Sequence, residues 1–125
     1  MHRSRLSTIV IDCNDLDAAT RFWTGALGTE VVAEDQPPYV TLTAKPGGLR
    51  LVLQQVPEPK TCKSRVHLDF DTDDLEAEVR RLEALGATRI EQVEAWWIMQ
   101  DPSGNKFCVI PAESDELGSD ANNWD

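Results

Sequence analysis

In the middle of the chain, the spacing of apolar residues changes from every second residue to the spacing of a helix. Residues 66–70 alternate apolar with polar side chains, which predicts a half-buried strand whose polar face carries His67 and Asp69. Helix-capping residues follow at 72–74, and apolar residues then recur at helical spacing until Gly86. A strand, a cap and a helix are therefore predicted in this order. The apolar residues of the strand that are predicted to face the core are Val66, Leu68 and Phe70.

The same unit occurs earlier in the chain. The spacing from Thr8 to Asp15 equals the spacing from His67 to Asp74. The earlier segment again alternates as a strand does, and the helical spacing that follows it ends at Gly28. An internal repeat of this kind predicts two similar modules in one chain.

Further strand patterns follow each predicted helix. The expected strands are 30–32, 39–43 and 49–54 in the first half, and 88–90, 96–99 and 106–110 in the second. Turn residues at 45–48 and 101–105 separate the last two strands of each half. A linker stiffened by two prolines is expected at 56–60. Each half therefore predicts a βαβββ module, at about 6–56 and 63–112.

The two modules are predicted to form a single domain over 1–112, since a chain of 125 residues is one domain's worth. The remaining residues, 113–125, are acidic and rich in Ser, Asn and Gly, which predicts a mobile tail. Trp124 has two interpretations, either an exposed residue of that tail or an anchor that docks on the domain.

Composition and charge narrow the class of protein. No apolar run reaches the roughly 20 residues that span a membrane, and no signal peptide is expected. The formal net charge of −10 would repel nucleic acid and anionic membrane surfaces, so neither is an expected partner. The three cysteines lack paired motif spacing, which favours a reducing, cytoplasmic location.

Two tandem βαβββ modules that end in the string DPSGNKFCV resemble the vicinal oxygen chelate superfamily, in particular its small glyoxalase-like and bleomycin resistance protein-like members. The string RVHLDF is also typical of such proteins. The resemblance covers about residues 6–112 and implies an α+β fold. In that fold the modules form an open, cupped mixed β-sheet barrel with the helices outside and a metal or ligand inside. A homodimer is also implied, and whether the cleft lies within one chain or is shared by two stays open.

In this superfamily, one position in the first strand and one in the last strand of each module supply the metal ligands. The matching positions here are Thr8, Val52, His67 and Cys108. A catalytic metal needs about three good ligands, which valine cannot be and threonine rarely is. Because two of the four positions are poor ligands, no intrinsic metal cofactor is expected. Zn²⁺ or Cu⁺ bound by the last two positions is the alternative, with Asp69 or Gln54 as a further ligand.

The polar registers of the strands predict a ligand-binding surface on the concave face. Adjacent residues of a strand point to opposite sides, so one of Trp96 and Trp97 must face the concavity. The predicted ligand-binding residues are Thr8, Arg50, Gln54, Asp69, Trp96, Trp97 and Cys108. His67 is the candidate catalytic residue, with a structural histidine as the alternative. Cys108 is equally well interpreted as a small buried hydrophobic residue.

Two functions from different classes remain open. The missing metal ligands favour a protein that binds a small polar, partly aromatic molecule in the cleft without a metal. The alternative is a metal-assisted lyase, isomerase or dioxygenase in which His67 is a metal ligand or the general base. The chain has no nucleophile elbow and no phosphate-binding glycine loop, so no other motif assigns a reaction. Whether the protein is an enzyme is therefore left open.

Overall fold

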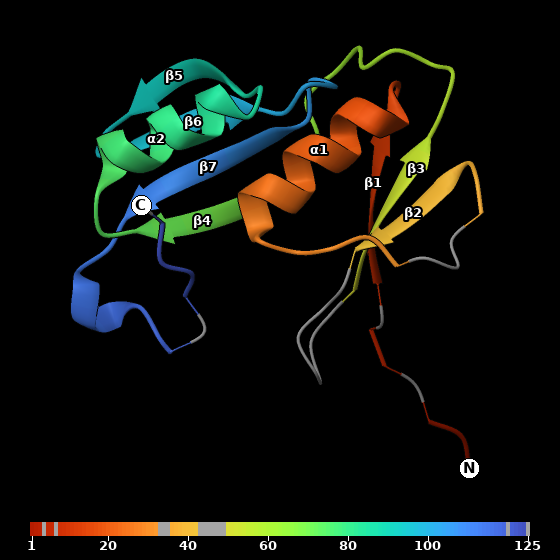
Figure 1. Ribbon diagram of the computed structural model, residues 1–125, viewed down its shortest axis with the longest axis horizontal. Helices are drawn as coiled ribbons and strands as arrows, with labels where there is room; N and C mark the ends of the chain where they lie inside the picture. Colours follow the sequence, from red (N-terminus) through yellow and green to blue (C-terminus); the bar gives the residue numbers. More distant parts are fainter. Residues whose placement is uncertain (4, 7, 33–35, 43–49, 120, 125) are drawn as a thin grey trace. The chain divides into compact units, whose positions relative to one another are not determined.

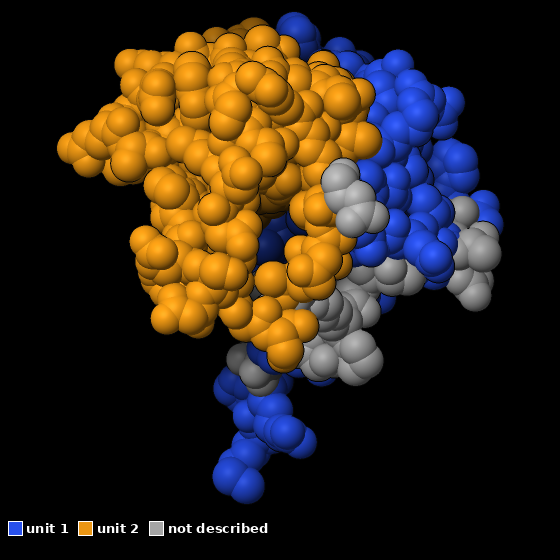
Figure 2. Space-filling model, turned by 60° about the vertical axis from the view of Figure 1, so that its left-hand side comes forward, with its two compact units in different colours: residues 1–59 blue, residues 60–125 orange. Residues whose placement is uncertain are grey.

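Two compact units make up the computed structural model, residues 1–59 and 60–125. Figure 1 traces the chain, and Figure 2 colours the two units. The structure describes residues 1–125 except 4, 7, 33–35, 43–49, 120 and 125. The boundary between the units falls within the segment predicted as a linker. In its described part, each unit has one α-helix and one β-sheet.

The first unit combines a three-stranded sheet with one helix (Figure 1). Its elements are β1 (Thr8–Cys13), α1 (Leu16–Leu27), β2 (Tyr39–Leu42) and β3 (Arg50–Gln55). The strands follow the order β1-β3-β2, with β1 parallel and β2 antiparallel to β3. Strand β1 is therefore an outer strand of its sheet.

The second unit repeats this plan with one more strand. Its elements are β4 (Leu68–Thr72), α2 (Leu75–Ala84), β5 (Thr88–Val93), β6 (Trp96–Gln100) and β7 (Lys106–Pro111), followed by a 3₁₀-helix at Ser114–Glu116. The order β4-β7-β6-β5 again places the first and last strands side by side and parallel. The α+β class and the internal repeat predicted from the sequence are confirmed.

The two helices begin with the same local structure. The carboxylate of Asp15 accepts a hydrogen bond from the backbone N–H of Ala18 at 3.0 Å, and Asp74 accepts one from Ala77 at 3.1 Å. Each aspartate is an N-cap that satisfies a donor which the first helical turn leaves unpaired. Helix α1 ends at Gly28, whose φ of 68° is the left-handed conformation that glycine adopts readily. Both predicted helix starts are therefore confirmed.

Each sheet buries the side chains that face its own helix. The buried apolar residues are Cys13, Ala19, Phe22, Trp23, Ala26, Leu42 and Leu53 in the first unit, and Val79, Leu82, Ala87, Met99, Phe107 and Val109 in the second. Helix α1 packs on β2 and β3, and helix α2 packs on β5 and β7. Because side chains alternate along a strand, this packing leaves the polar registers on the opposite face of each sheet.

The start of β4 corrects the sequence prediction. Pairing between β4 and β7 begins at Leu68 and Phe107, so Val66 and His67 precede the strand. Without a paired neighbour, Val66 has no sheet face to join, and its side chain is 80% exposed. The alternation of apolar and polar residues thus begins at Val66, before the strand begins at Leu68. Val66 is not a core residue.

Other predicted strands change in length. The strand expected at 30–32 is reduced to an isolated antiparallel bridge between Val31 and Leu42. The strand expected at 88–90 continues to Val93, through a register shift between Arg89 and Glu91 that the sequence pattern did not reveal. The turn predicted at 45–48 lies outside the described residues.

A buried aspartate organises the turn between β6 and β7. Asp101 is 2% exposed, and its carboxylate accepts hydrogen bonds from the backbone N–H groups of Ser103 at 2.9 Å and Asn105 at 2.7 Å. The side-chain amide of Asn105 donates a third hydrogen bond at 3.0 Å. The predicted turn at 101–105 is therefore held by one carboxylate, which also fixes where β7 begins.

The C-terminal residues contact helix α2 through Trp124. The guanidinium of Arg81 lies 3.8 Å from the centroid of the Trp124 ring, within the range of a cation–π interaction. The same Arg81 donates to the carboxylate of Glu78 at 2.7 Å. The structure thus supports the docking interpretation of Trp124.

Among the described residues, no helix is long and apolar enough to cross a membrane.

Candidate functional site

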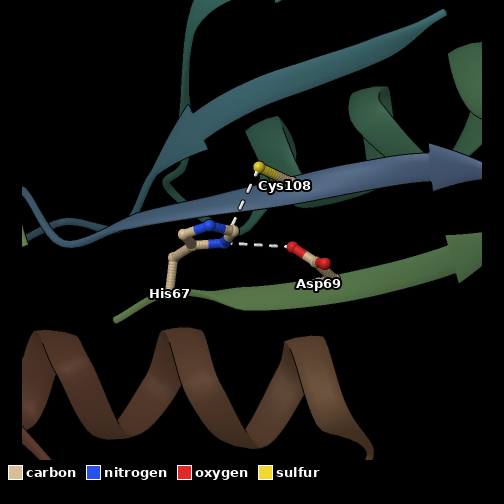
Figure 3. Close-up of side chains that lie close together, drawn as sticks. All are labelled: His67, Asp69 and Cys108. Carbon is tan, nitrogen blue, oxygen red and sulfur yellow. Dashed lines mark hydrogen bonds and ion pairs between the residues drawn. The ribbon is translucent and has the colours of Figure 1, made fainter. Parts of the chain in front are cut away.

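Three unlike polar side chains converge in the second unit, and Figure 3 shows them together. His67 lies immediately before β4, Asp69 is on β4 and Cys108 is on β7. The Nδ1 atom of His67 lies 3.1 Å from Asp69 Oδ1 and 4.0 Å from Cys108 Sγ. The three possible ligand atoms all lie within 4.8 Å of one another. These residues are called the His67 cluster below.

Strand register explains why the His67 cluster forms. Asp69 and Cys108 are direct partners in the parallel pairing of β4 with β7, so their side chains lie on one face of the sheet. Phe107 and Val109, the neighbours of Cys108, are buried on the side that packs on α2. The cluster therefore lies on the face opposite α2, as the alternation of residues predicts.

Hydrogen bonding orients the imidazole ring of His67. The ring and the Asp69 carboxylate are 46% and 49% exposed, so the pair is accessible to solvent. A hydrogen bond between Nδ1–H and Asp69 favours the tautomer in which Nε2 carries a lone pair. Among the described residues, no hydrogen-bond partner is found for Nε2. The ring can therefore accept a proton or a hydrogen bond at Nε2.

The thiol of Cys108 has a perturbed environment. Burial, followed by the charge of Asp69 and a hydrogen bond to it, raises the pKa of this half-buried thiol. The charge of Lys63 acts in the opposite direction and lowers the pKa. A raised pKa keeps the thiol protonated near neutral pH, which argues against an activated nucleophile.

The His67 cluster also provides a test of the metal that the fold family implies. Of the family-equivalent positions, Val52 carries a hydrocarbon side chain with no donor atom, so that set of four does not fit a metal. The His67 cluster offers an imidazole nitrogen, a carboxylate oxygen and a sulfur within one unit. Three such donors are the number and the kinds that zinc sites use. The residues of the cluster therefore fit a metal. Asp69 would be a ligand, although it is not one of the four family-equivalent positions.

The structure separates the two tryptophans. Trp97 pairs with Val109, which is fully buried, and the guanidinium of Arg89 lies 5.1 Å from the centroid of its ring. Since Arg89 also forms ion pairs with α2, Trp97 lies on the helix-facing side. This position corrects its prediction as a ligand-binding residue. Trp96 is half-buried on the face opposite α2, as is Ile98, the partner of Cys108 on β6.

The other predicted site residues belong to the first unit. Thr8 pairs with Arg50 across β1 and β3, and Asp12 pairs with Gln54. Val52 pairs with Val10, whose side chain is 51% exposed on the face opposite α1. The four predicted residues in this unit, Thr8, Arg50, Val52 and Gln54, thus share one face. A joint site with the His67 cluster stays a prediction.

Sequence reasoning missed two neighbours of the His67 cluster. Ile98 adds an apolar side chain beside Cys108, and Lys63 adds a positive charge close enough to affect the thiol. Ile98 could have been found from strand register, because it occupies the same face as Trp96 in the alternation of β6. Lys63 lies outside the regular elements, so no periodic signal indicates it.

Comparisons with known proteins agree with this architecture. A glyoxalase-like domain model matches residues 8–110, while no curated protein matches. A glyoxalase/bleomycin resistance protein/dioxygenase family enzyme from Burkholderia phytofirmans PsJN has a TM-score of 0.68 and 20% identity, covering 86% of this chain and 98% of that one.

Two further solved structures indicate the range of chemistry on this fold. An antibiotic binding protein from Streptomyces sp. CB03234 has a TM-score of 0.60 and 21% identity, over 89% of this chain and 98% of that one. A fosfomycin resistance protein from Listeria monocytogenes, solved with Mn(II) and a dihydroxypropylphosphonic acid, has a TM-score of 0.63 and 14% identity, over 88% and 90%. Identities this low show the shared fold alone. Because the domain model spans most of the chain, including the helix of each unit and the His67 cluster, the protein belongs to the glyoxalase-like domain family.

Proposed function

We propose that the protein binds a small polar molecule on the face opposite α2 in the second unit, at the His67 cluster. The observation that carries this proposal is the hydrogen bond at 3.1 Å between His67 and Asp69, which orients the ring and leaves Nε2 accessible. A preoriented, half-exposed imidazole is suited to recognising a donor group on a ligand. The antibiotic binding protein of the same fold supports a binding role.

The surroundings of the His67 cluster indicate the chemical class of the ligand. Trp96 and Ile98 are half-buried on the same face and offer aromatic and aliphatic surface. A ligand with a flat apolar part and a hydrogen-bond donor would contact both kinds of group. The carboxylate of Asp69 beside the imidazole disfavours a ligand that places an anionic group against it, unless a cation is also bound. The proposed ligand is therefore a polar, partly aromatic molecule.

A ligand screen by two-dimensional amide NMR tests the binding proposal. We expect hits from a collection of small polar aromatic compounds to shift the amide signals of His67, Asp69 and Cys108, and His67→Ala to weaken their binding about 10-fold or more. His2→Ala is the matched control, because His2 lies in the exposed N-terminal segment. The 46% exposure of His67 predicts a loss of no more than about 1 kcal/mol in the free energy of unfolding of His67→Ala. Hits that map elsewhere, or that bind His67→Ala unchanged, would contradict the proposal.

The same hydrogen bond favours one catalytic alternative, in which His67 acts as a general base on a bound molecule. Asp69 would orient the ring and stabilise the imidazolium that forms when Nε2 takes up a proton. A base of this kind catalyses exchange of an acidic carbon-bound proton with solvent. Hits incubated in D₂O would then lose such a proton signal with the wild-type protein and retain it with His67→Ala. Equal exchange rates with the two proteins would leave binding as the function of the site.

The cellular location also belongs to this proposal. All three cysteines are free, and one of them, Cys62, is exposed in the described structure. Exposed thiols persist in reducing compartments. We therefore place the protein in the cytoplasm.

A further inference from the structure

We propose that the His67 cluster is a zinc site formed entirely within the second unit. The three donor atoms would be His67 Nδ1, Asp69 Oδ1 and Cys108 Sγ, the atoms that approach one another in the cluster. This inference goes beyond the binding of a small molecule at the same place, because the metal would be held without any ligand present. It also replaces the expectation of no intrinsic metal, which rested on the four family-equivalent positions and left Asp69 only a secondary role.

The distances fit a tetrahedral site. With zinc bonds of about 2.0–2.1 Å to nitrogen and oxygen and about 2.3 Å to sulfur, neighbouring ligand atoms lie about 3.3–3.6 Å apart. The His67 cluster has 3.1 Å from nitrogen to oxygen and 4.0 Å from nitrogen to sulfur. The nitrogen–oxygen separation lies below the tetrahedral value and the nitrogen–sulfur separation lies above it, while all three donor atoms lie within 4.8 Å of one another. Small rotations of the side chains would therefore bring all three donors to bonding distance.

The ring nitrogen of His67 that faces the other two donors is Nδ1, so this nitrogen would bind the zinc. Both Asp69 and Cys108 approach Nδ1 of His67, and Figure 3 shows the three side chains directed toward a common region. Zinc would take the place of the proton that Nδ1 shares with Asp69, that proton would move through solvent to Nε2 so that the ring stays neutral, and the proton of the thiol would pass to solvent. The cation would also offset the repulsion between the Asp69 carboxylate and a thiolate at the partly buried Cys108 sulfur.

The donor set determines which metal the site would prefer. Thiolate and imidazole ligands suit zinc, whereas Mn²⁺ and Mg²⁺ prefer oxygen ligands. We therefore expect a preference for zinc, unlike the Mn(II) in the fosfomycin resistance protein of the same fold. Because His67 and Asp69 are about half exposed, the fourth tetrahedral position would face solvent and remain open to a ligand oxygen.

Metal titration of the full chain in the absence of any small molecule tests the zinc site. Protein stripped with a chelator is titrated with Zn²⁺ against a chromophoric competitor, and with Co²⁺, whose thiolate charge-transfer absorption reports a bond to sulfur. We expect one zinc per chain, a thiolate band with Co²⁺, and Mn²⁺ binding at least about 100-fold weaker. Loss of a ligand in Cys108→Ser or His67→Ala should weaken zinc binding about 100-fold or more, and Cys108→Ser should abolish the thiolate band.

Cys62→Ser is the matched control, since Cys62 is an exposed cysteine of the same unit outside the cluster. It should bind zinc as the wild type does. Wild-type protein that binds no zinc at micromolar concentrations, or zinc binding that is lost in Cys62→Ser and kept in Cys108→Ser, would overturn the proposal. Circular dichroism checks the fold of each variant, and Asp69→Asn, which keeps the shape of the side chain, replaces any variant that fails to fold.

The zinc site and the proposed binding function can fail separately. Ligand binding is measured with a chelator present, and zinc binding is measured with no small molecule. Ligand binding without zinc binding would remove only the metal site. Zinc binding without any ligand hit would remove only the proposed binding function.

Discussion

At the scale of single residues, Asp69 influences both of its neighbours in the His67 cluster. Its carboxylate fixes the tautomer of His67 through the hydrogen bond at 3.1 Å, and its charge raises the pKa of the Cys108 thiol. One substitution at this position should therefore change the imidazole and the thiol together. The thiol offers the simpler measurement, because its reaction rate follows the thiolate fraction.

Alkylation of metal-free protein with iodoacetamide tests the effect of Asp69 on Cys108. The raised pKa means that the Cys108 thiolate forms only at higher pH. Cys108 should therefore react more slowly than exposed Cys62 near neutral pH, and the ratio of the two rates should rise with pH. Asp69→Asn removes a negative charge, lowers the pKa and should speed the reaction of Cys108 several-fold. Peptide mass spectrometry after timed quenching measures both sites.

Lys63 provides a control of opposite sign for the same measurement. Its charge lowers the pKa of Cys108, so Lys63→Met should slow the alkylation of Cys108. Asp73→Asn removes an exposed carboxylate that is not among the causes of the shift and should change nothing. An unchanged reaction rate in Asp69→Asn would show that burial controls the thiol without help from the charge of Asp69.

At the scale of elements, hydrogen-bonding side chains decide where helices and turns begin. Asp15 and Asp74 occupy equivalent places in the two modules and make the same N-cap hydrogen bond. The turn between β6 and β7 depends on a carboxylate in a similar way, with Asp101 accepting three hydrogen bonds while almost fully buried. These devices act over a few residues, so the sequence reveals them directly.

Substitution of Asp101 should be among the more costly changes in the second unit. Asp101→Ala leaves the N–H groups of Ser103 and Asn105 without their acceptor, which we expect to lower the free energy of unfolding by about 1–3 kcal/mol. Asp101→Asn keeps one acceptor oxygen and should cost less. Chemical denaturation curves measure both variants. A loss in Asp101→Ala no larger than in the exposed-site control Asp73→Ala would show that the turn forms without this carboxylate.

The sequence predicts the elements well wherever the signal is local. Both helices were foreseen from caps and periodicity, because each stripe of apolar residues packs on its own sheet. Strand ends were predicted less well, since pairing and not alternation decides them. Val66 continues the apolar alternation yet lies outside β4, because the pairing with β7 starts only at Leu68. The bulge in β5 has no signal in the residue pattern at all.

At the scale of the whole molecule, the internal repeat was the most useful sequence signal. It predicted two modules with the same order of elements, and the structure adds that both units pair their first and last strands in parallel, β1 with β3 and β4 with β7. The candidate site was predicted only in part. The face of His67, Asp69 and Cys108 followed from register, but their convergence on one ring nitrogen depends on side-chain conformation, which a periodic pattern does not encode. Which of two adjacent tryptophans faces the helix also required the pairing of β6 with β7.

The last prediction concerns assembly, for which the family resemblance implies a dimer. Strands β1 and β4 are each an outer strand of their own sheet, and Val10 and Val66 are 51% and 80% exposed. A second copy would cover apolar side chains of this kind. The net charge of −10 on each chain opposes association, and salt reduces this repulsion as the screening length falls from about 30 Å at 0.01 M to about 8 Å at 0.15 M.

Light scattering coupled to size-exclusion chromatography should therefore give twice the chain mass of 14.0 kDa at 0.15 M salt, with partial dissociation at 0.01 M and low protein concentration. Val10→Lys and Val66→Lys each replace an exposed apolar side chain by a charged one, and the variant whose position lies at the interface should favour the monomer. Dimers that dissociate as salt increases would indicate an interface held by ion pairs instead of apolar contacts. A mass of 14.0 kDa at every salt and protein concentration would rule out the dimer, and any ligand or metal would then have to be bound by a single chain.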